Sequence, residues 1–456
     1  MYIEQIYTGC LAQASYYIES EGEAVIIDPI RDAEPYLRLL KNRNANLKYI
    51  LETHFHADFV SGHIELANST NAEIVFGPNA KTLYKCIVAE DQEEFYIGEL
   101  VFRVLHTPGH TMESTCYLLL SSQYIEQAVF TGDTLFVGEV GRPDLAVNPN
   151  LTSVDLAKKL YQSLHNVLMK LPDDVVVYPA HGAGSACGKN ISAERESTIG
   201  LQKKYNYALQ PMSQEKFVEI VLDGIASAPI YFTHDVSLNK NGYESVSRTL
   251  SKSLNKLSSQ QISSEIESGA IVLDVRLPND FEKGFIPGSI NIGKIGMFAP
   301  WVGTIISPKK KLIVVCNNAE AEEVISRLAR IGYEDVIGYT NGLDEWRGEN
   351  QATEMIESIH PSDMASLMTD KSVILDVRKS SELEIGFVKN SINIPLDKLQ
   401  ANLHTMKKTD NFFIYCAGGY RSMIACSILK SKGYQNIKNI YGGFSAISKN
   451  IDSCII

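Results

Sequence analysis

Three side chains that can bind a metal ion follow a short apolar run in this 456-residue chain. The run covers residues 47–51, and His54, His56 and Asp58 come soon after it at alternate positions. Alternate residues at the end of an extended strand point to the same side, so the two imidazoles can converge. Imidazoles and carboxylates are common metal ligands in proteins. The spacing therefore predicts a metal-dependent reaction rather than a polar turn with incidental histidines.

Three further candidates lie downstream, and each follows a short apolar run and precedes Gly or Thr. They are His110, Asp133 and His181. We expect each of them in a loop at the end of a strand. The complete series, His-x-His-x-Asp followed by His, Asp and His, resembles the metallo-β-lactamase fold over roughly the first half of the chain. This resemblance implies an αββα sandwich of two sheets with helices outside.

Phe59 departs from the pattern of the dinuclear hydrolases of this fold, which usually have a histidine directly after the motif's aspartate to hold a second metal. Without that imidazole we expect a single metal on His54, His110 and Asp133. Two histidines and one carboxylate with open positions are the ligand set of non-haem Fe(II) oxygenases. Zinc more often takes a third histidine or a thiolate. The residue types thus favour oxygen chemistry over hydrolysis.

The pattern resembles the persulfide dioxygenase branch of the metallo-β-lactamase fold. This resemblance implies one Fe(II) per chain. It also implies that His56, Asp58 and His181 lie near the iron without binding it.

Arg142 follows Asp133 closely, in the segment Gly-Arg-Pro-Asp. In the related dioxygenases a matching arginine lies near the thiol substrate, so Arg142 is a candidate for holding a substrate carboxylate. On charge patterning alone, a surface arginine that caps a helix is equally compatible.

Cys187 lies in a run of small residues, 182–189, directly after His181. Small residues let the backbone approach a ligand closely, and Lys189 supplies a nearby cation that favours a thiolate. Cys187 is therefore a candidate for binding or carrying sulfur at the metal site. The alternative is a small residue in a tight loop.

Charge and hydropathy exclude several classes of partner. The formal net charge is -12, which argues against nucleic acid and membrane surfaces as partners. No run approaches the roughly 18 apolar residues needed to span a bilayer, and the first residues show no signal-peptide pattern. The eight cysteines contain no CxxC pair. We expect a protein of a reducing compartment, most simply the cytoplasm.

The second half of the chain contains an internal repeat. Residues 270–276 return as 373–378, and residues 284–292 return as 386–394. The spacing is that of a duplicated small domain, and apolar strands alternating with helices indicate a parallel sheet in each copy. Both copies resemble rhodanese domains. The expected organisation is a dioxygenase domain at 1–240, a Ser-, Asn- and Lys-rich linker at 241–261, a degenerate rhodanese domain at 262–352 and an active one at 353–456.

The second copy contains a candidate nucleophile, Cys416, at the end of a buried strand. The loop that follows consists of Ala417, Gly418, Gly419, Tyr420 and Arg421. Such a loop can turn its N–H groups inward, and the helix after it directs its N-terminus at the sulfur. Both features stabilise a thiolate and a persulfide. Four residues separate Cys416 from Arg421, as in sulfurtransferases, whereas related phosphatases use five.

The first copy keeps a cysteine, Cys316, without these surroundings. The next seven residues contain no glycine, and Ala321 stands where Arg421 does. The same seven residues include three glutamates, which would repel a thiolate and raise its pKa. We interpret this copy as a structural or docking domain.

The whole chain resembles a persulfide dioxygenase–rhodanese fusion. The resemblance implies that a low-molecular-weight persulfide is oxidised with O2 to sulfite and a thiol. It also implies that Cys416 passes sulfane sulfur to sulfite to give thiosulfate, which detoxifies sulfide-derived persulfide. Fusions of this type often self-associate, so we expect a homo-oligomer.

Three other functions stay open. The first is a thioester hydrolase of the glyoxalase II type, which needs a second metal. The second is a plain sulfurtransferase whose first domain only binds a ligand. The third is a non-enzymatic sulfur-relay adaptor, which requires an unreactive Cys416.

Overall fold

The computed structural model describes residues 1–349 and 351–450; the end of the last predicted domain, at residue 456, lies outside them. The chain forms two compact units. The first holds Met1–Thr249 together with Ser326–Tyr333, and the second holds residues 250–325 and the chain from residue 334 onward. Within the described residues, no helix is long and apolar enough to cross a membrane.

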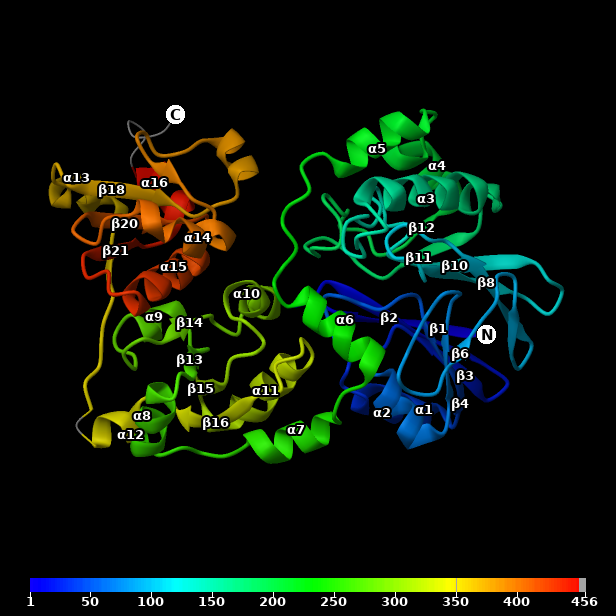
Figure 1. Cartoon of the computed structure of the whole chain (residues 1–456), viewed down its shortest axis with the longest axis horizontal. Helices are drawn as coiled ribbons and strands as arrows, with labels where there is room; N and C mark the ends of the chain where they lie inside the picture. The colour runs from blue at the N-terminus through cyan, green and yellow to red at the C-terminus, as the bar shows by residue number, and fades with distance from the viewer. Residues whose placement is uncertain (350, 451–456) are drawn as a thin grey trace. The chain divides into compact units, whose positions relative to one another are not determined.

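Two six-stranded sheets form the body of the first unit (Figure 1). The first sheet has the order β1 (Tyr2–Thr8), β2 (Gln13–Ser20), β3 (Glu23–Ile27), β4 (Asn46–Glu52), β5 (Glu73–Phe76) and β6 (Ile87–Val88). The second has the order β12 (Ser197–Thr198), β11 (Val176–Pro179), β10 (Glu126–Gly132), β9 (Thr115–Leu120), β8 (Leu100–His106) and β7 (Glu94–Ile97).

Helices complete the first unit. They are α1 (Glu34–Arg43), α2 (His63–Thr70), α3 (Ser153–Asn166), α4 (Ile199–Tyr205), α5 (Gln214–Leu222) and α6 (Phe232–Asn241), and the boundary between the two units falls within α7 (Val246–Ser253). The segment expected to link the domains, 241–261, therefore contains α7 and the start of the next helix.

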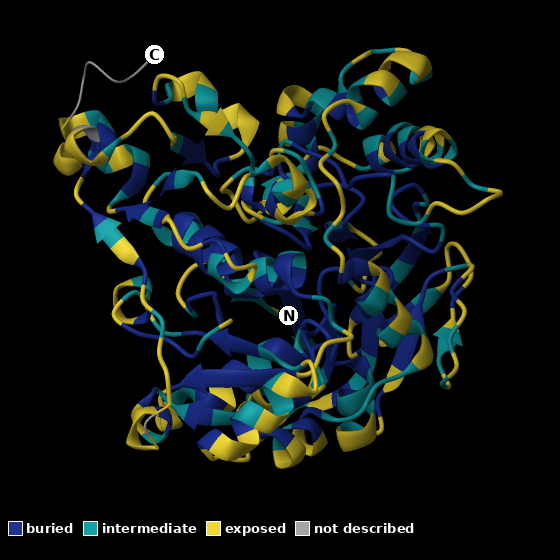
Figure 2. Ribbon diagram, turned by 60° about the vertical axis from the view of Figure 1, so that its left-hand side comes forward, coloured by how far each residue is buried: buried dark blue, intermediate teal, exposed yellow. Residues whose placement is uncertain are grey.

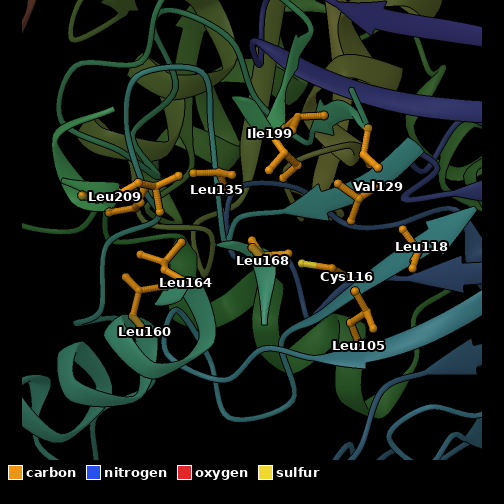
Figure 3. Packing of buried hydrophobic residues seen from close by; sticks show 14 of the residues in the cluster. Leu105, Cys116, Leu118, Val129, Leu135, Leu160, Leu164, Leu168, Ile199 and Leu209 are labelled. Atoms are coloured by element: carbon orange, nitrogen blue, oxygen red, sulfur yellow. The ribbon is translucent and has the colours of Figure 1, made fainter. Parts of the chain in front are cut away.

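Strand β9 shows why the second sheet is covered on both faces. All six of its residues are buried. Tyr117 and Leu119 pack between the two sheets, whereas Cys116, Leu118 and Leu120 pack against the helical layer. Figure 3 shows the helical side of this core, in which Leu160 and Leu164 of α3 take part. The alternation follows the two-residue period of a strand and confirms the sandwich predicted for this half of the chain.

The second unit contains two parallel sheets, as the repeat predicts. The first has the order β14 (Ile290–Asn291), β13 (Ile271–Asp274), β15 (Leu312–Cys316) and β16 (Val336–Asn341). The second has the order β17 (Glu357–Ile359), β21 (Ile437–Ile440), β20 (Asn411–Tyr415), β18 (Ser372–Asp376) and β19 (Ile392–Asn393). The central strands β15 and β20 are largely buried, and exposed residues gather on helices and loops (Figure 2).

Helices connect the strands of both copies. In the first copy they are α8 (Ser259–Glu267), α9 (Pro278–Phe281), α10 (Phe298–Ile305), α11 (Ala321–Ala329) and α12 (Asp344–Gly348). In the second they are α13 (Met364–Leu367), α14 (Leu399–Asn402), α15 (Tyr420–Ser431) and α16 (Gly443–Asn450). Each candidate cysteine of the repeat thus lies at the carboxyl end of a central strand, followed by a loop and a helix.

Candidate metal centre and sulfur-transfer loop

The candidate metal ligands of the first unit lie in loops that follow strands. His54 comes after β4, and His110 comes after β8. Asp133 directly follows β10, and His181 follows β11 and the single residue Ala180. The strand before His54 belongs to the first sheet and the strands before the other three residues belong to the second, so strand ends of both sheets bring together residues far apart in the sequence. The structure brings these four side chains together, and all are at least 98% buried.

Gly109 lets the His110 loop approach helix α3. A Cβ atom at Gly109 would lie 2.4 Å from Leu160 Cα, and the φ angle of Gly109 is +151°. A side chain therefore has neither the room nor the backbone conformation there. The loop and the helix pack backbone to backbone, which holds His110 in place.

The first group of possible ligands is His54, His110 and Asp133. One ligand atom from each lies within 4.8 Å of the other two. Asp133 Oδ2 is 3.4 Å from His110 Nε2 and 3.8 Å from His54 Nε2. Among the described residues, His54 Nε2 and both carboxylate oxygens of Asp133 have no hydrogen-bond partner although they are buried. Buried polar atoms without partners are rare, and a shared metal ion would satisfy all three, so these residues fit a bound metal.

Hydrogen bonds fix how both histidines present their Nε2 atoms. Thr53 donates its hydroxyl to Asp28 Oδ2, so its oxygen accepts from His54 Nδ1, 3.0 Å away. His110 Nδ1 donates to the carbonyl oxygen of Arg142 at 2.8 Å. Each Nε2 lone pair is then free to bind a metal. Burial and neighbouring histidines lower the pKa of His54 well below its ordinary value, which keeps the imidazole neutral.

His56 does not join this group, although its imidazole lies beside that of His54. The rings of His54 and His56 are 4.2 Å apart, centre to centre. His56 Nε2, however, faces Asp28 Oδ1 at 3.1 Å and Glu52 Oε2 at 3.6 Å. Burial alone would lower the pKa of His56, but the two carboxylates outweigh burial and raise it to about 9. The neighbouring carboxylates therefore favour the charged form of the His56 ring.

Asp58, His181 and Cys187 form a second group of possible ligands that the sequence did not connect. Their ligand atoms lie within 4.8 Å of one another. His181 Nε2 is 3.4 Å from Asp58 Oδ2 and 3.5 Å from Asp133 Oδ1. Asp133 therefore directs one oxygen at each group. Phe59, which replaces the usual second-metal histidine, stacks on His56 instead, with ring centres 4.3 Å apart.

Cys187 lies beside the metal ligands, but Lys189 is not what polarises it. Lys189 Nζ donates to the carbonyl oxygens of Ile220 and Asp223. The thiol is 99% buried, and burial, together with the charges of Asp58 and Asp133, raises its pKa well above the ordinary value. The nearby-cation argument for a thiolate is therefore wrong, because the dominant neighbours are carboxylates.

Arg142 is buried and fully engaged with the protein. Its Nε and one NH2 group donate to both carboxylate oxygens of Asp144, at 2.6 and 2.7 Å. Its guanidinium also donates to the carbonyl oxygens of Ala186 and Ala226, and its backbone N–H donates to the carbonyl of Cys187. Arg142 thus connects the His110 loop to the Cys187 loop.

In the second unit, Cys416 follows β20 and precedes α15, as the sequence indicates. Its Sγ accepts a hydrogen bond from the Gly419 N–H at 3.1 Å and lies 3.7 Å from Ser422 Oγ. The side chain is 1% exposed. The N-terminus of α15 begins at Tyr420. An N–H donor and a helix N-terminus both favour negative charge on the sulfur.

Arg421 is paired with Glu382, a partner that sequence reasoning missed. Its two NH groups donate to the two carboxylate oxygens of Glu382, at 2.6 and 2.7 Å. The hydrogen bonds from Arg421 lower the pKa of Glu382, which keeps the carboxylate charged. No local feature of the sequence pairs Arg421 with Glu382, which lies 39 positions away.

Cys316 lies in a setting that disfavours its thiolate. It is fully buried at the end of β15. Burial first, then the charges of Glu320 and Asp274, raises its pKa to about 12. The two copies thus place a cysteine at the same position of the fold in different surroundings.

Comparison with known proteins agrees with this architecture. The metallo-beta-lactamase superfamily matches residues 8–181, and the rhodanese-like domain matches residues 258–349 and 360–450. The probable hydroxyacylglutathione hydrolase glo2 of Schizosaccharomyces pombe is 37% identical over 206 residues, which are 40% of this chain and 75% of that protein.

Two solved structures are similar. A metallo-beta-lactamase from Staphylococcus aureus subsp. aureus COL covers 75% of this chain and 99% of its own, with 28% identity and a TM-score of 0.68. ETHE1 from Myxococcus xanthus covers 53% and 98%, with 30% identity and a TM-score of 0.46. The chain belongs to the metallo-beta-lactamase superfamily, and two rhodanese-like domains follow its metal-binding domain.

Proposed function

We propose that this enzyme oxidises a low-molecular-weight persulfide with O2 and transfers sulfane sulfur through Cys416 to sulfite. The observation that carries the proposal is the ligand set. His54, His110 and Asp133 offer two imidazoles and one carboxylate, while His56, the next imidazole, is held by Asp28. Two histidines and a carboxylate with open positions are typical of non-haem Fe(II) oxygenases.

His54, His110 and Asp133 would hold one Fe(II) per chain. Bound iron would supply open coordination positions at which a persulfide and O2 can meet. The protein's own part is to orient the ligands. Thr53 fixes the tautomer of His54, and the Arg142 carbonyl fixes that of His110. Burial excludes bulk water, which protects a persulfide from side reactions.

The first half-reaction balances with one water. One persulfide, one O2 and one H2O give one thiol, one sulfite and two protons. The sulfur–sulfur bond breaks, the terminal sulfur is oxidised, and O2 accepts four electrons. We assign Cys187 the task of contacting the terminal sulfur, because its thiol lies beside Asp133 and is buried.

We assign Arg142 a positioning role rather than the holding of a substrate carboxylate. Its guanidinium already donates to Asp144 and two backbone carbonyls. Through these bonds it fixes the segment that carries Cys187, and through its carbonyl it fixes His110. Asp58 and His181 would remain near the iron without binding it.

The second half-reaction takes place at Cys416. Its thiolate attacks the terminal sulfur of a persulfide, which forms the Cys416 persulfide and releases the thiol. Sulfite then attacks that sulfur, so thiosulfate leaves and the thiolate returns. The Gly419 N–H and the N-terminus of α15 stabilise the thiolate in both steps. Arg421, oriented by Glu382, faces the incoming anions.

We further propose that residues 1–240 form the dioxygenase domain, 262–352 the inert rhodanese domain and 353–456 the active one. The three matched regions, 8–181, 258–349 and 360–450, support this division. A cytoplasmic site of action is supported by the seven cysteines of the described residues, all of which are free.

One observation favours a second candidate, a thioester hydrolase with two metals. Asp58, His181 and Cys187 could hold a second ion, with Asp133 shared between both. A similar curated protein is a probable hydroxyacylglutathione hydrolase. A thiolate in that group would favour zinc, so the two functions predict different metals.

A Cys416→Ser variant separates the two half-reactions. With glutathione persulfide, we expect the variant to consume O2 and release sulfite at the wild-type rate. Addition of sulfite and persulfide should yield thiosulfate with the wild type and not with the variant. Absence of persulfide-dependent O2 uptake in both proteins, together with hydrolysis of a glutathione thioester, would replace the dioxygenase by the hydrolase.

A further inference from the structure

Tyr420 joins the sulfur-transfer loop to the inert rhodanese copy. It is the first residue of α15, directly after Gly419. Its hydroxyl donates to the carbonyl oxygen of Gly293 at 2.8 Å. Its ring lies over the same segment, since a Cβ atom at Gly293 or Gly296 would be 3.5 or 3.9 Å from it. A loop residue of the active copy thus contacts the chain that follows β14 of the first copy.

A second hydrogen bond extends this contact along α15. Ser427 lies two turns after Tyr420, and its hydroxyl accepts from the Asn291 N–H at 3.0 Å. Asn291 belongs to β14, the edge strand of the first copy's sheet. Both copies lie in the same compact unit. The first copy therefore contacts α15 at its first residue and again two turns later.

On its other side, the loop that begins at Cys416 is held by hydrogen bonds within the second copy. The carbonyl oxygens of Cys416 and Ala417 accept from the N–H groups of Phe444 and Ser445. These bonds turn the carbonyls away from the sulfur. Between the two supports, Gly418 is open, since a Cβ atom there would meet nothing within 4 Å.

Gly419 depends on its neighbour for orientation. Its φ angle is +104°, and a glycine can move into or out of this backbone conformation at little energetic cost. Its N–H is the donor to Cys416 Sγ. Because Tyr420 is the next residue, the bond from Tyr420 to Gly293 limits how far the Gly419 peptide can rotate.

We propose that Tyr420 is a positioning residue and that the inert rhodanese copy is the support on which it orients the Gly419 N–H towards Cys416. This inference rests on the proposed sulfur transfer at Cys416. The inert copy then contributes to sulfur transfer in the active copy, although the inert copy supplies no reactive group.

Tyr420→Phe is the first test, because it keeps the ring and removes the hydroxyl. Transfer from the Cys416 persulfide to sulfite should be about fivefold slower in a single turnover, as expected for one lost hydrogen bond. The pH midpoint of Cys416 alkylation should rise, which a purely structural contact would not cause. The control is Ser427→Ala, which removes another hydrogen bond between α15 and the first copy and should leave both readouts unchanged.

A substitution in the inert copy is the second test. In Gly293→Val the new side chain would press on the carbonyl oxygen of Arg276, 3.3 Å from its Cβ position, and on the Tyr420 ring, 3.5 Å from it. We expect the same slowing and the same shift of the alkylation midpoint. Gly348→Val is the matched control, since its Cβ position is open.

Wild-type rates and midpoints in both Tyr420→Phe and Gly293→Val would overturn the inference. Equal losses in Ser427→Ala would also overturn it, because the contact would then be structural only. Wild-type protein that transfers no sulfur would instead refute the proposed function itself, so the two failures are distinguishable.

Discussion

His56 Nε2 lies 3.1 Å from Asp28 Oδ1. Asp28 also accepts from the N–H and the hydroxyl of Thr53. The Asp28 carboxylate thus pairs with His56, which keeps that imidazole from joining the metal ligands. Through Thr53, it also fixes the tautomer of His54. The segment His54, His56 and Asp58 contributes one residue to each of three buried groups of possible ligands among the described residues.

Thr53→Val tests the connection from Asp28 to His54. The substitution keeps the shape and removes the acceptor for His54 Nδ1, so the imidazole is free to rotate or change tautomer. We expect iron affinity to fall about 10- to 100-fold, the usual effect of losing a hydrogen bond to a metal ligand. Competition with a chelator measures the affinity. Thr53→Ser keeps a hydroxyl and should restore most of it; equal losses in both variants would contradict the connection.

Arg142→Lys separates positioning from substrate binding. Lysine cannot make the two parallel bonds to Asp144, so both loops should loosen. We expect kcat for O2 uptake to fall about tenfold with glutathione persulfide and equally with a persulfide that lacks a carboxylate. A KM increase confined to glutathione persulfide would show instead that the guanidinium holds a substrate carboxylate.

The two rhodanese cysteines should differ sharply in reactivity. Burial and the charges of Glu320 and Asp274 raise the pKa of Cys316 to about 12, so its thiol is protonated at neutral pH. At pH 8, iodoacetamide should modify Cys416 at least about 100-fold faster than Cys316. Mass spectrometry of the digested protein gives both rates. Sulfur transfer should survive Cys316→Ser and disappear in Cys416→Ser; an essential Cys316 would contradict its assignment as inert.

Glu382→Gln tests the pair with Arg421 through its pH dependence. Arg421 lowers the pKa of Glu382, so the stabilisation is complete above the ordinary carboxylate pKa and is lost as pH falls through the lowered value. At pH 7 the variant should be less stable by about 1 kcal/mol. The difference in melting temperature between the two proteins should shrink below about pH 4. A difference independent of pH would mean that the pair contributes nothing through charge.

The sequence predicted the fold well because its signals are local and periodic. Buried strands such as β15 and β20 contain continuous apolar runs, and the internal repeat predicted two parallel sheets. Candidate residues at strand ends were found for the same reason, since a polar residue directly after an apolar run stands out.

Partners across long sequence distances could not be predicted. The ion pair between His56 and Asp28 joins residues that are 28 positions apart in the sequence. Cys187 and Asp58, which lie close together in the fold, are 129 positions apart. Lys189 is near Cys187 in sequence but its ammonium group donates to backbone carbonyls elsewhere. Tertiary packing decides these contacts, and no local spacing encodes them.

Metal content measured together with oxygen uptake tests the central proposal most directly. The protein would be purified without oxygen, its iron and zinc quantified, and O2 consumption recorded on adding glutathione persulfide or coenzyme A persulfide. We expect about one iron per chain and uptake of one O2 per persulfide, because His54, His110 and Asp133 form one open site. Two zinc ions per chain and no uptake would contradict the proposal and assign Asp58, His181 and Cys187 to a second metal.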